Sequence, residues 1–390
     1  MTEQMKPSGI AWIKEIPQSW ELNKVKYLAT EPETLFLDGD WIESDVIVES
    51  GIRYLTTGNV GAGFYKDQGS GYITQKTFDE LHCLKVFPGD LMMSRLNEPI
   101  GRACIVPEGE DYYVVAVDNV ILRPNEEYDK KFIMYAMNTE GYAEHGNMIA
   151  RGATMSRVSR SQLGQFWLAF PKLKEQQQIA AFLDDKCSKI DGIIADIEKQ
   201  IEILQKYKKS LITEAVTKGL ERSVPMKNSG MKNVDDIPQG WSVQRLKYVS
   251  RLKTGTTPAG NEGINYEGQG IPWFTPSDFI PSLELEKSEK FVDDETINRE
   301  GITPYPANSV LLVAIGATVG KIGITKSKGY SNQQITAIIP TGIDSKYLLY
   351  YLFSKADYIK DNALYTTLPI INNAYLSNIP VICFHQQFSF

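Results

Sequence analysis

Segment 151–160 holds the side chains of this sequence that are best suited to binding a polyanion. It contains three arginines, hydroxyl side chains between them and no acidic residue. Arginine can donate two hydrogen bonds to O6 and N7 of guanine or pair with phosphate, while hydroxyls and backbone amides contact phosphate. A solvated loop before a helix is the alternative. We predict DNA contacts at Arg151, Thr154, Arg157 and Arg160.

Further clusters in both halves could approach a DNA backbone. Segment 253–258 is a glycine-containing turn rich in hydroxyls, and such a turn can come close to phosphates. The nearby Trp273 fits a hydrophobic core better than a stacking surface. Segments 64–66 and 93–95 each end in a basic side chain, although a strand end would explain 64–66 equally well. We predict further DNA contacts at Lys66, Arg95, Lys253, Thr254 and Thr256.

The sequence lacks the motifs of common catalytic sites. Segment 316–321 resembles a phosphate-binding loop, but it is one residue short, and Ile322 replaces the Ser or Thr that would hold magnesium. A tight turn explains it better. No two prolines are adjacent, so the Pro-Pro loop of amino-group DNA methyltransferases is absent. We expect no catalytic residue, no metal and no bound cofactor in this chain. A nuclease whose catalytic carboxylates belong to no recognisable motif is the alternative.

Composition points to a cytoplasmic protein. The length of 390 residues and the 42% apolar content allow two or three domains with cores of their own. Four cysteines without a CxxC pair and only three histidines disfavour a disulfide framework or a zinc site. No apolar run reaches the roughly 18 residues that span a membrane. The net charge of −7 argues mildly against nucleic acid, unless a local patch or a basic partner supplies phosphate contacts.

The two halves of the sequence repeat each other. The pentapeptide Ile-Pro-Gln-Ser-Trp at 16–20 returns as Ile-Pro-Gln-Gly-Trp at 237–241, which is 221 residues later, and two dipeptides recur at the same offset. A repeat of this length indicates a duplicated domain. The counterpart of the arginine-rich segment in the second copy, 365–373, carries no charge, so the two loops must read different bases if both lie on DNA. There we predict DNA contacts at Tyr365, Thr366 and Asn372.

A long helix is predicted between the two copies. Segment 173–216 contains no proline, and apolar residues recur in it at steps of seven and of four. This heptad pattern is typical of a helix that packs against another helix, and it would extend roughly 65 Å. A long helix lying on a domain is the alternative. We predict a subunit interface, called the seam, at Leu183, Ile190, Ile194, Ile197, Ile201, Leu204 and Leu211.

Together these features resemble the specificity subunits of Type I restriction–modification systems. The resemblance covers residues 8–382 and is strongest over 171–219, which looks like the family's conserved central region. The paired Ile-Pro-x-x-Trp segments, segment 254–258 with Trp273, and the turn ending at Lys321 also carry it. The implied fold is α+β. Two similar mixed α/β target-recognition domains are separated by a long helical segment that forms a coiled coil.

The resemblance also implies where the domains of the chain lie and which activities belong to other subunits. It places target-recognition domains at 1–170 and 237–382, a central helical spacer at 171–218, a linker at 219–236 and the truncated start of a second helical region at 383–390. The domains would read the two halves of a bipartite site on double-stranded DNA. Two modification subunits with S-adenosylmethionine would methylate adenine, and restriction subunits would use ATP and magnesium to translocate and cut DNA.

The sequence departs from the family pattern near residue 383. The second copy should end in a Pro-x-Leu-x-Glu-Gln helix, but 384–390 do not match that pattern. We therefore expect another polypeptide, such as a second copy of this chain, to supply the helix that pairs with the seam. A DNA-binding adaptor that assembles with no methylating subunit is the alternative.

Overall fold

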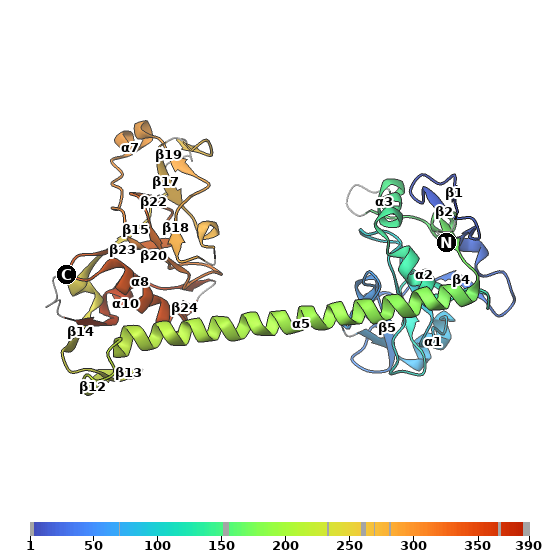
Figure 1. Ribbon diagram of the computed structural model, residues 1–390, viewed down its shortest axis with the longest axis horizontal. Helices are drawn as coiled ribbons and strands as arrows, with labels where there is room; N and C mark the ends of the chain where they lie inside the picture. Colours follow the sequence, from blue (N-terminus) through green and yellow to red (C-terminus); the bar gives the residue numbers. More distant parts are fainter. Residues whose placement is uncertain are drawn as a thin grey trace. The chain divides into compact units, whose positions relative to one another are not determined.

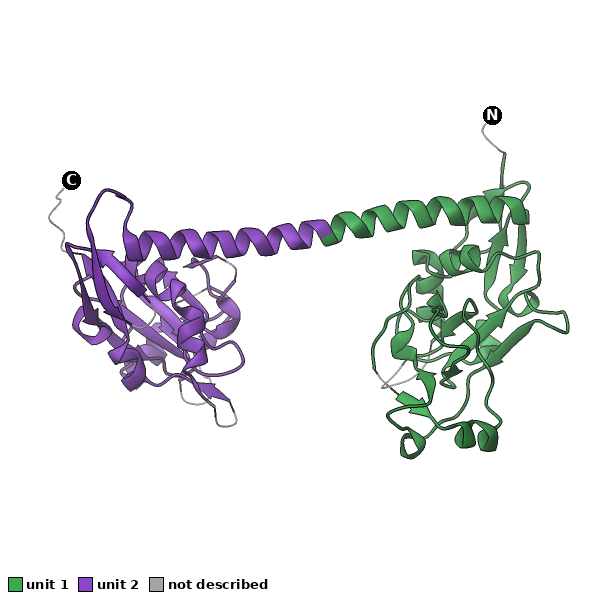
Figure 2. Cartoon of the chain, turned by 90° about the horizontal axis from the view of Figure 1, so that it is seen from below, with its two compact units in different colours: residues 1–195 green, residues 196–390 purple. Residues whose placement is uncertain are grey.

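The structure, a computed structural model, describes residues 4–69, 71–150, 156–231, 234–258, 263–268, 270–280, 282–365 and 368–384. The chain forms two compact units, residues 1–195 and residues 196–390 (Figure 2). Each unit combines small sheets with short helices, and helix α5 (Leu173–Lys218) continues from the first unit into the second (Figure 1). The predicted α+β class, with two similar mixed domains joined by a long helix, is confirmed.

Unit 1 is built around an antiparallel sheet in the order β4-β10-β7-β8. All four residues of the central strand β7 are buried, and α2 packs beside β8. Smaller sheets are β1-β2, β11-β3 and β6-β5-β9. The elements are β1 (Met5–Pro7), β2 (Glu15–Pro17), β3 (Glu21–Lys24), β4 (Leu35–Asp38), β5 (Ile52–Leu55), β6 (Gly71–Ile73), α1 (Gln75–Leu81), β7 (Leu91–Ser94), β8 (Ala103–Ile105), β9 (Val114–Val115), β10 (Asn119–Arg123), α2 (Lys130–Met137), α3 (Glu140–Ile149), α4 (Arg160–Leu163) and β11 (Trp167–Phe170).

Unit 2 repeats this plan with the central sheet β15-β23-β20-β21-β18. Its other sheets are β12-β13, β14-β26, β16-β19-β17-β22 and β24-β25. The elements are β12 (Met226–Met231), β13 (Val234–Pro238), β14 (Trp241–Arg245), α6 (Leu246–Val249), β15 (Ser250–Thr254), β16 (Ile264–Asn265), β17 (Ile271–Phe274), β18 (Glu284–Leu285), β19 (Phe291–Val292), α7 (Asp294–Glu300), β20 (Val310–Val313), β21 (Ile322–Thr325), β22 (Tyr330–Ser331), β23 (Ile335–Pro340), α8 (Ser345–Ser354), α9 (Ala356–Asp361), β24 (Leu364–Tyr365), β25 (Pro369–Ile370), α10 (Asn373–Asn378) and β26 (Pro380–Phe384).

The strand registers show that the duplication extends beyond the matching sequence motifs. Met5 pairs with Pro17 in the hairpin β1-β2, and Met226 pairs with Pro238 in β12-β13, so both partners are displaced by the same 221 residues. In the central sheets β10 pairs antiparallel with both β4 and β7, and β23 pairs in the same way with β15 and β20. Residues at matching register positions in the two units are therefore structurally equivalent.

The segment predicted to be a linker, 219–236, contains β12 and much of β13. Gly230 lies within β12, where the pairing with β13 shifts register between Asn228 and Met231, and its φ of +73° is a conformation that favours glycine. Val234 and Ile237 from β13 are buried in the core of unit 2, together with Val216 from the last turn of α5. The hairpin therefore anchors the end of α5, in addition to connecting the helix to β14.

Helix α5 is one uninterrupted helix of 46 residues, as the heptad pattern predicted. Its apolar row is largely open to solvent in this chain: Ile190, Ile197 and Leu204 are 55%, 49% and 63% exposed. Leu183, at the start of the row, is half-buried. Neither α5 nor any other helix among the described residues combines the length and apolar character needed to cross a membrane. An exposed apolar row of this kind is suited to packing against another helix.

A buried ion pair in unit 1 has no counterpart in unit 2. Asp90, 2% exposed, accepts hydrogen bonds from Arg123 at 2.7–2.9 Å and from the Phe87 backbone amide at 2.8 Å. The equivalent Ser309 is also buried but donates to the Pro306 carbonyl. Because Asp90→Ala removes the carboxylate that pairs with the Arg123 guanidinium, we expect unit 1 to lose about 3 kcal/mol of stability.

Hydrogen exchange followed by mass spectrometry reports on each unit of the Asp90→Ala chain separately. Amides of β7 and β10 should exchange faster, while those of β20 and β23 stay unchanged. The matched variant Ser309→Ala removes one neutral hydrogen bond and should cost about 1 kcal/mol in unit 2. Equally small increases in exchange for the two substitutions would contradict a stabilising role of the Asp90–Arg123 ion pair.

Candidate nucleic-acid interface

Arg95 follows the buried strand β7 and is itself buried, with 5% of its surface exposed. Its guanidinium donates to the carbonyls of Val158 at 2.9 Å and Val117 at 2.6 Å. It also pairs with two carboxylates, Asp38 at 3.0 Å and Asp118 at 3.6 Å. All of these partners of Arg95 belong to unit 1. The predicted DNA contact at Arg95 is wrong, because the residue holds together segments that are distant in sequence.

Two arginines of the predicted recognition segment pair with the same carboxylates. Arg157 Nη2 lies 2.6 Å from Asp118 Oδ1, and Arg160 Nε lies 3.6 Å from Asp38 Oδ2. The five residues form an alternating row, Arg157–Asp118–Arg95–Asp38–Arg160, which we call the Arg–Asp network. Arg95, at the centre of the row, is buried, whereas the side chains of Arg157 and Arg160 at its ends are 48% and 37% exposed. The network therefore presents arginines at the surface from a fixed base.

Backbone contacts hold the second half of the recognition segment in place. The amide of Asn97 donates to the Ser156 carbonyl at 2.9 Å, and the amide of Val158 donates to the Arg95 carbonyl at 3.1 Å. Ser159 then caps α4 by accepting from the Gln162 amide. Two residues predicted in the same segment, Arg151 and Thr154, lie outside the described residues.

The equivalent position in unit 2 is uncharged. Leu96 bridges to Arg157 in unit 1, and the equivalent Ile315 bridges to Ile370 in unit 2. Where Arg160 meets Asp38, Asn373 Nδ2 donates to Thr254 Oγ1 at 2.9 Å. The same scaffold therefore offers charged side chains in one unit and neutral side chains in the other.

The other predicted contacts of unit 2 are divided between surface and structural positions. Thr254 and Thr256 are exposed, whereas the Lys253 ammonium donates to the Thr303 carbonyl. Desolvation by burial lowers the pKa of Lys253. The exposed Asn372 caps α10 through its side-chain oxygen, which accepts from the Tyr375 amide at 2.7 Å. Thr366 and the side chain of Tyr365 lie outside what the structure describes.

The remaining predicted contact, Lys66, lies at the surface, whereas the basic residue that follows the glycine turn in each unit is structural. Lys66 is exposed, and its ammonium lies 5.9 Å from the centre of the Phe64 ring. The segment ending at Lys321 forms the predicted tight turn, with Gly320 at φ +90°. Lys321 donates to the Phe279 carbonyl at 3.3 Å, as the equivalent Arg102 donates to Val60 at 2.8 Å. In both units this basic side chain fastens the turn to the rest of the unit.

Sequence reasoning missed the two carboxylates of the network. Neither Asp38 nor Asp118 belongs to a motif in the sequence. Both lie at positions that only the sheet register brings next to Arg95: Asp38 ends β4, and Asp118 directly precedes β10. The alternation of charges could not be read from the sequence, because the five residues are spread from position 38 to position 160.

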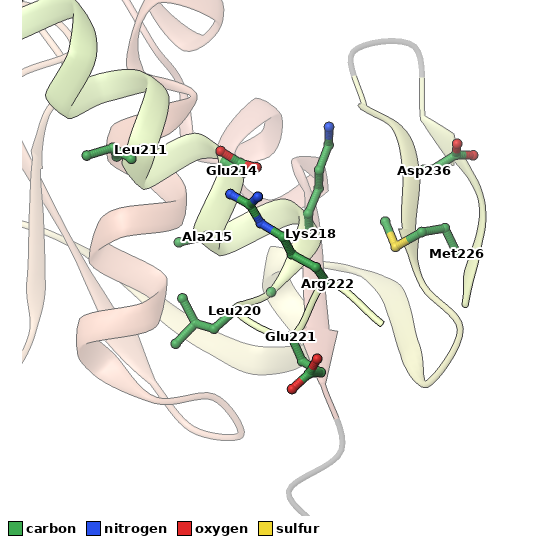
Figure 3. A pocket seen from close by; sticks show the side chains of 10 residues that line it. Leu211, Glu214, Ala215, Lys218, Leu220, Glu221, Arg222, Met226 and Asp236 are labelled. Carbon is green, nitrogen blue, oxygen red and sulfur yellow. The ribbon is translucent and has the colours of Figure 1, made fainter. Parts of the chain in front are cut away.

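Other possible binding features carry less chemical specificity. The pocket at the end of α5 is lined by both acidic and basic side chains, including Glu214, Lys218, Glu221, Arg222 and Asp236 (Figure 3). These mixed charges favour neither an anion nor a cation. Within the described ranges, no three His, Cys, Asp or Glu side chains group closely enough to hold a metal ion.

Comparison with known proteins gives one consistent result. The family model described as "Type I restriction modification DNA specificity domain" matches residues 39–203 and 238–383. The chain is 23% identical to the Type I restriction enzyme MjaIX specificity subunit of Methanocaldococcus jannaschii, over 95% of this chain and 84% of that protein. It is also 23% identical to the HindI specificity subunit of Haemophilus influenzae, over 75% of this chain and 76% of the relative.

A solved structure supports the same fold. One chain from a study of complex assembly and conformational transition in the type I restriction–modification system superimposes with a TM-score of 0.64. The alignment covers 95% of this chain and 87% of that chain at 16% sequence identity. The two matched segments of the family model cover most of both units, in agreement with the duplicated strand registers. This chain belongs to the Type I restriction–modification DNA specificity family.

Proposed function

We propose that this chain recognises a two-part DNA site for a Type I restriction–modification complex, with each unit reading one half of the site. One observation carries the proposal: the two units share a scaffold in register but differ in charge at equivalent exposed positions. A duplicated scaffold gives two similar docking surfaces, and different side chains on it give two different base preferences. Family membership supports the same function.

Catalysis then belongs to other subunits. We propose two modification subunits that use S-adenosylmethionine to methylate adenine, and restriction subunits that use ATP and magnesium to translocate and cut DNA. This chain would choose the site and hold those subunits there. Basic surfaces on the partners would supply phosphate contacts that a chain with a net charge of −7 supplies only locally.

The exposed seam supports a helical partner for α5. In unit 2 the end of α5 packs against Trp241 and Tyr347, and the Tyr347 hydroxyl donates to the Val216 carbonyl at 2.9 Å. The equivalent aromatic pair in unit 1, Trp20 and Phe132, has nearly the same separation, 6.1 Å against 6.3 Å.

In unit 1 this aromatic pair lines an apolar groove together with Trp12, Ile13 and Leu168. The groove therefore matches the surface that receives the end of α5 in unit 2. We propose that a second helix of the same type runs antiparallel to α5 and ends there. A second specificity chain would supply it. This partner accounts at once for the exposed seam and for the apolar groove.

Methylation mapping tests the main proposal. Coexpression of the chain with the modification subunit encoded beside it should place N6-methyladenine in a motif of two short parts with a fixed gap, detected by long-read sequencing. The purified chain alone should not cleave DNA. Binding without any methylation would favour the adaptor alternative, and metal-dependent cleavage by the chain alone would favour a nuclease.

Thiol labelling tests the helical partner, because Cys187 lies in the apolar row of α5 and is the exposed cysteine. Burial raises the pKa of Cys83 to about 11 and that of Cys104 to about 12, and it also raises the pKa of Cys383. At pH 8 these three thiols are protonated and covered, so a thiol reagent should label Cys187 first. Pairing of α5 with another helix should slow that labelling.

Two substitutions on α5 provide the matched comparison for this experiment. Ile197→Asp places a charge in the seam and should prevent pairing, which restores fast labelling and lowers the mass measured by light scattering. Lys199→Asp changes an exposed residue outside the seam and should leave both measurements unchanged. Equal labelling of the native chain and the Ile197→Asp chain, at the mass of one chain, would argue against any second specificity chain.

A further inference from the structure

We propose that Arg157 reads a guanine in the half-site of unit 1, and that Asp118 positions Arg157 for this contact. The assignment rests on the proposed function and deepens it, since it names the base and the residue. The evidence is the geometry of the Arg–Asp network and its absence from the equivalent place in unit 2.

The guanidinium of Arg157 is held at one end and open at the other. Asp118 Oδ1 lies 2.6 Å from Nη2 and is the side-chain partner of Arg157 among the described residues. Nearly half of the Arg157 side chain remains exposed. A guanidinium has five N–H donors in a rigid plane, so an ion pair at Nη2 leaves enough donors for two parallel hydrogen bonds. Guanine offers O6 and N7 as the matching pair of acceptors.

Contacts with the buried Arg95 hold Asp118 in place. The buried Arg95 lies 3.6 Å from the same Oδ1 atom, and the Arg95 amide donates to the Asp118 carbonyl at 2.8 Å. Asp118 therefore cannot follow Arg157 if that side chain moves, and Arg157 has one preferred position before DNA arrives. Ordering a long side chain in advance lowers the entropy that binding must supply.

The ion pair with Asp118 also affects whether Arg157 contacts a base or a phosphate. Asp118 also pairs with Arg95, and the two carboxylates of the network offset most, though not all, of the charge of its three arginines. Arg157 in this network therefore attracts phosphates less than a free arginine does. It keeps its directional donors, which a base edge requires. The ion pair with Asp118 therefore favours base reading by Arg157 over a contact that any DNA backbone would satisfy.

Unit 2 supplies the internal comparison. The residues equivalent to Arg157, Asp118 and Arg95 are Ile370, Gln334 and Ala314, as the matching bridges and backbone hydrogen bonds show. None of the three is charged. The guanine contact is thus confined to the half-site of unit 1, and at this position the two half-sites differ in the base that they require.

The test maps adenine methylation by the full chain with its modification subunit, for the native chain and for four variants. Arg157→Ala should relax the motif at a single guanine of one half-site, with roughly 10- to 100-fold lower discrimination there. Arg157→Lys keeps the charge but loses the planar fork, so it should relax the same position. Ile370→Ala, the matched control in unit 2, should leave that guanine required.

Asp118→Asn separates positioning from charge. It should relax the same guanine partly, while binding to unrelated DNA becomes tighter and more dependent on salt, because Arg157 then carries an uncompensated charge. A merely structural role of Asp118 would weaken binding to all DNA alike. Hydrogen exchange of β7 and β10 checks that each variant keeps the fold of unit 1.

Two results would overturn the assignment and leave the proposed function standing. In the first, Arg157→Ala lowers methylation at every site while the two-part motif stays unchanged, as expected for a phosphate contact. In the second, Arg157→Lys retains the native motif in full. A native chain that directs no two-part methylation would instead refute the proposed function, and the guanine assignment with it.

Discussion

In both units a strand that is buried along its whole length, β7 in one and β20 in the other, ends where the candidate recognition side chains are displayed. Its antiparallel partners fix the register, and a shift by one residue would turn its apolar side chains out of the core. The sheet therefore sets which residues stand beside the segments 156–160 and 370–373. Specificity can change at those positions without any change in the strands beneath them.

Burial of Arg95 shows how such a scaffold carries charge. A lone guanidinium in a protein interior is costly, but Arg95 donates to two carbonyls and forms ion pairs with two carboxylates. The same carboxylates reach the surface arginines, so acidic residues take part in presenting basic ones. An acidic chain can therefore hold a locally defined basic site, and its net charge says little about that site.

The sequence predicted the repeated domains, the α+β class and the uninterrupted helix α5, because each leaves a periodic or repeated pattern in the residues. It did not predict the role of Arg95, since the partners Asp38 and Asp118 are brought to it only by strand pairing. The hairpin β12-β13 was also missed, because serine, asparagine and glycine mark a turn as readily as a flexible connection. Pairings between distant strands leave no local pattern to read.

The uncovered apolar row of α5 has a consequence for the chain as it is made. Unit 1 contains the first half of α5 and can fold on the ribosome before unit 2 has been synthesised. During that interval the exposed isoleucines could associate with those of neighbouring nascent chains. The ion pairs Asp185–Lys189 and Glu202–Lys206, each spaced four residues along the helix, surround this row with charge. Pairing of the row with a second helix would end that exposure.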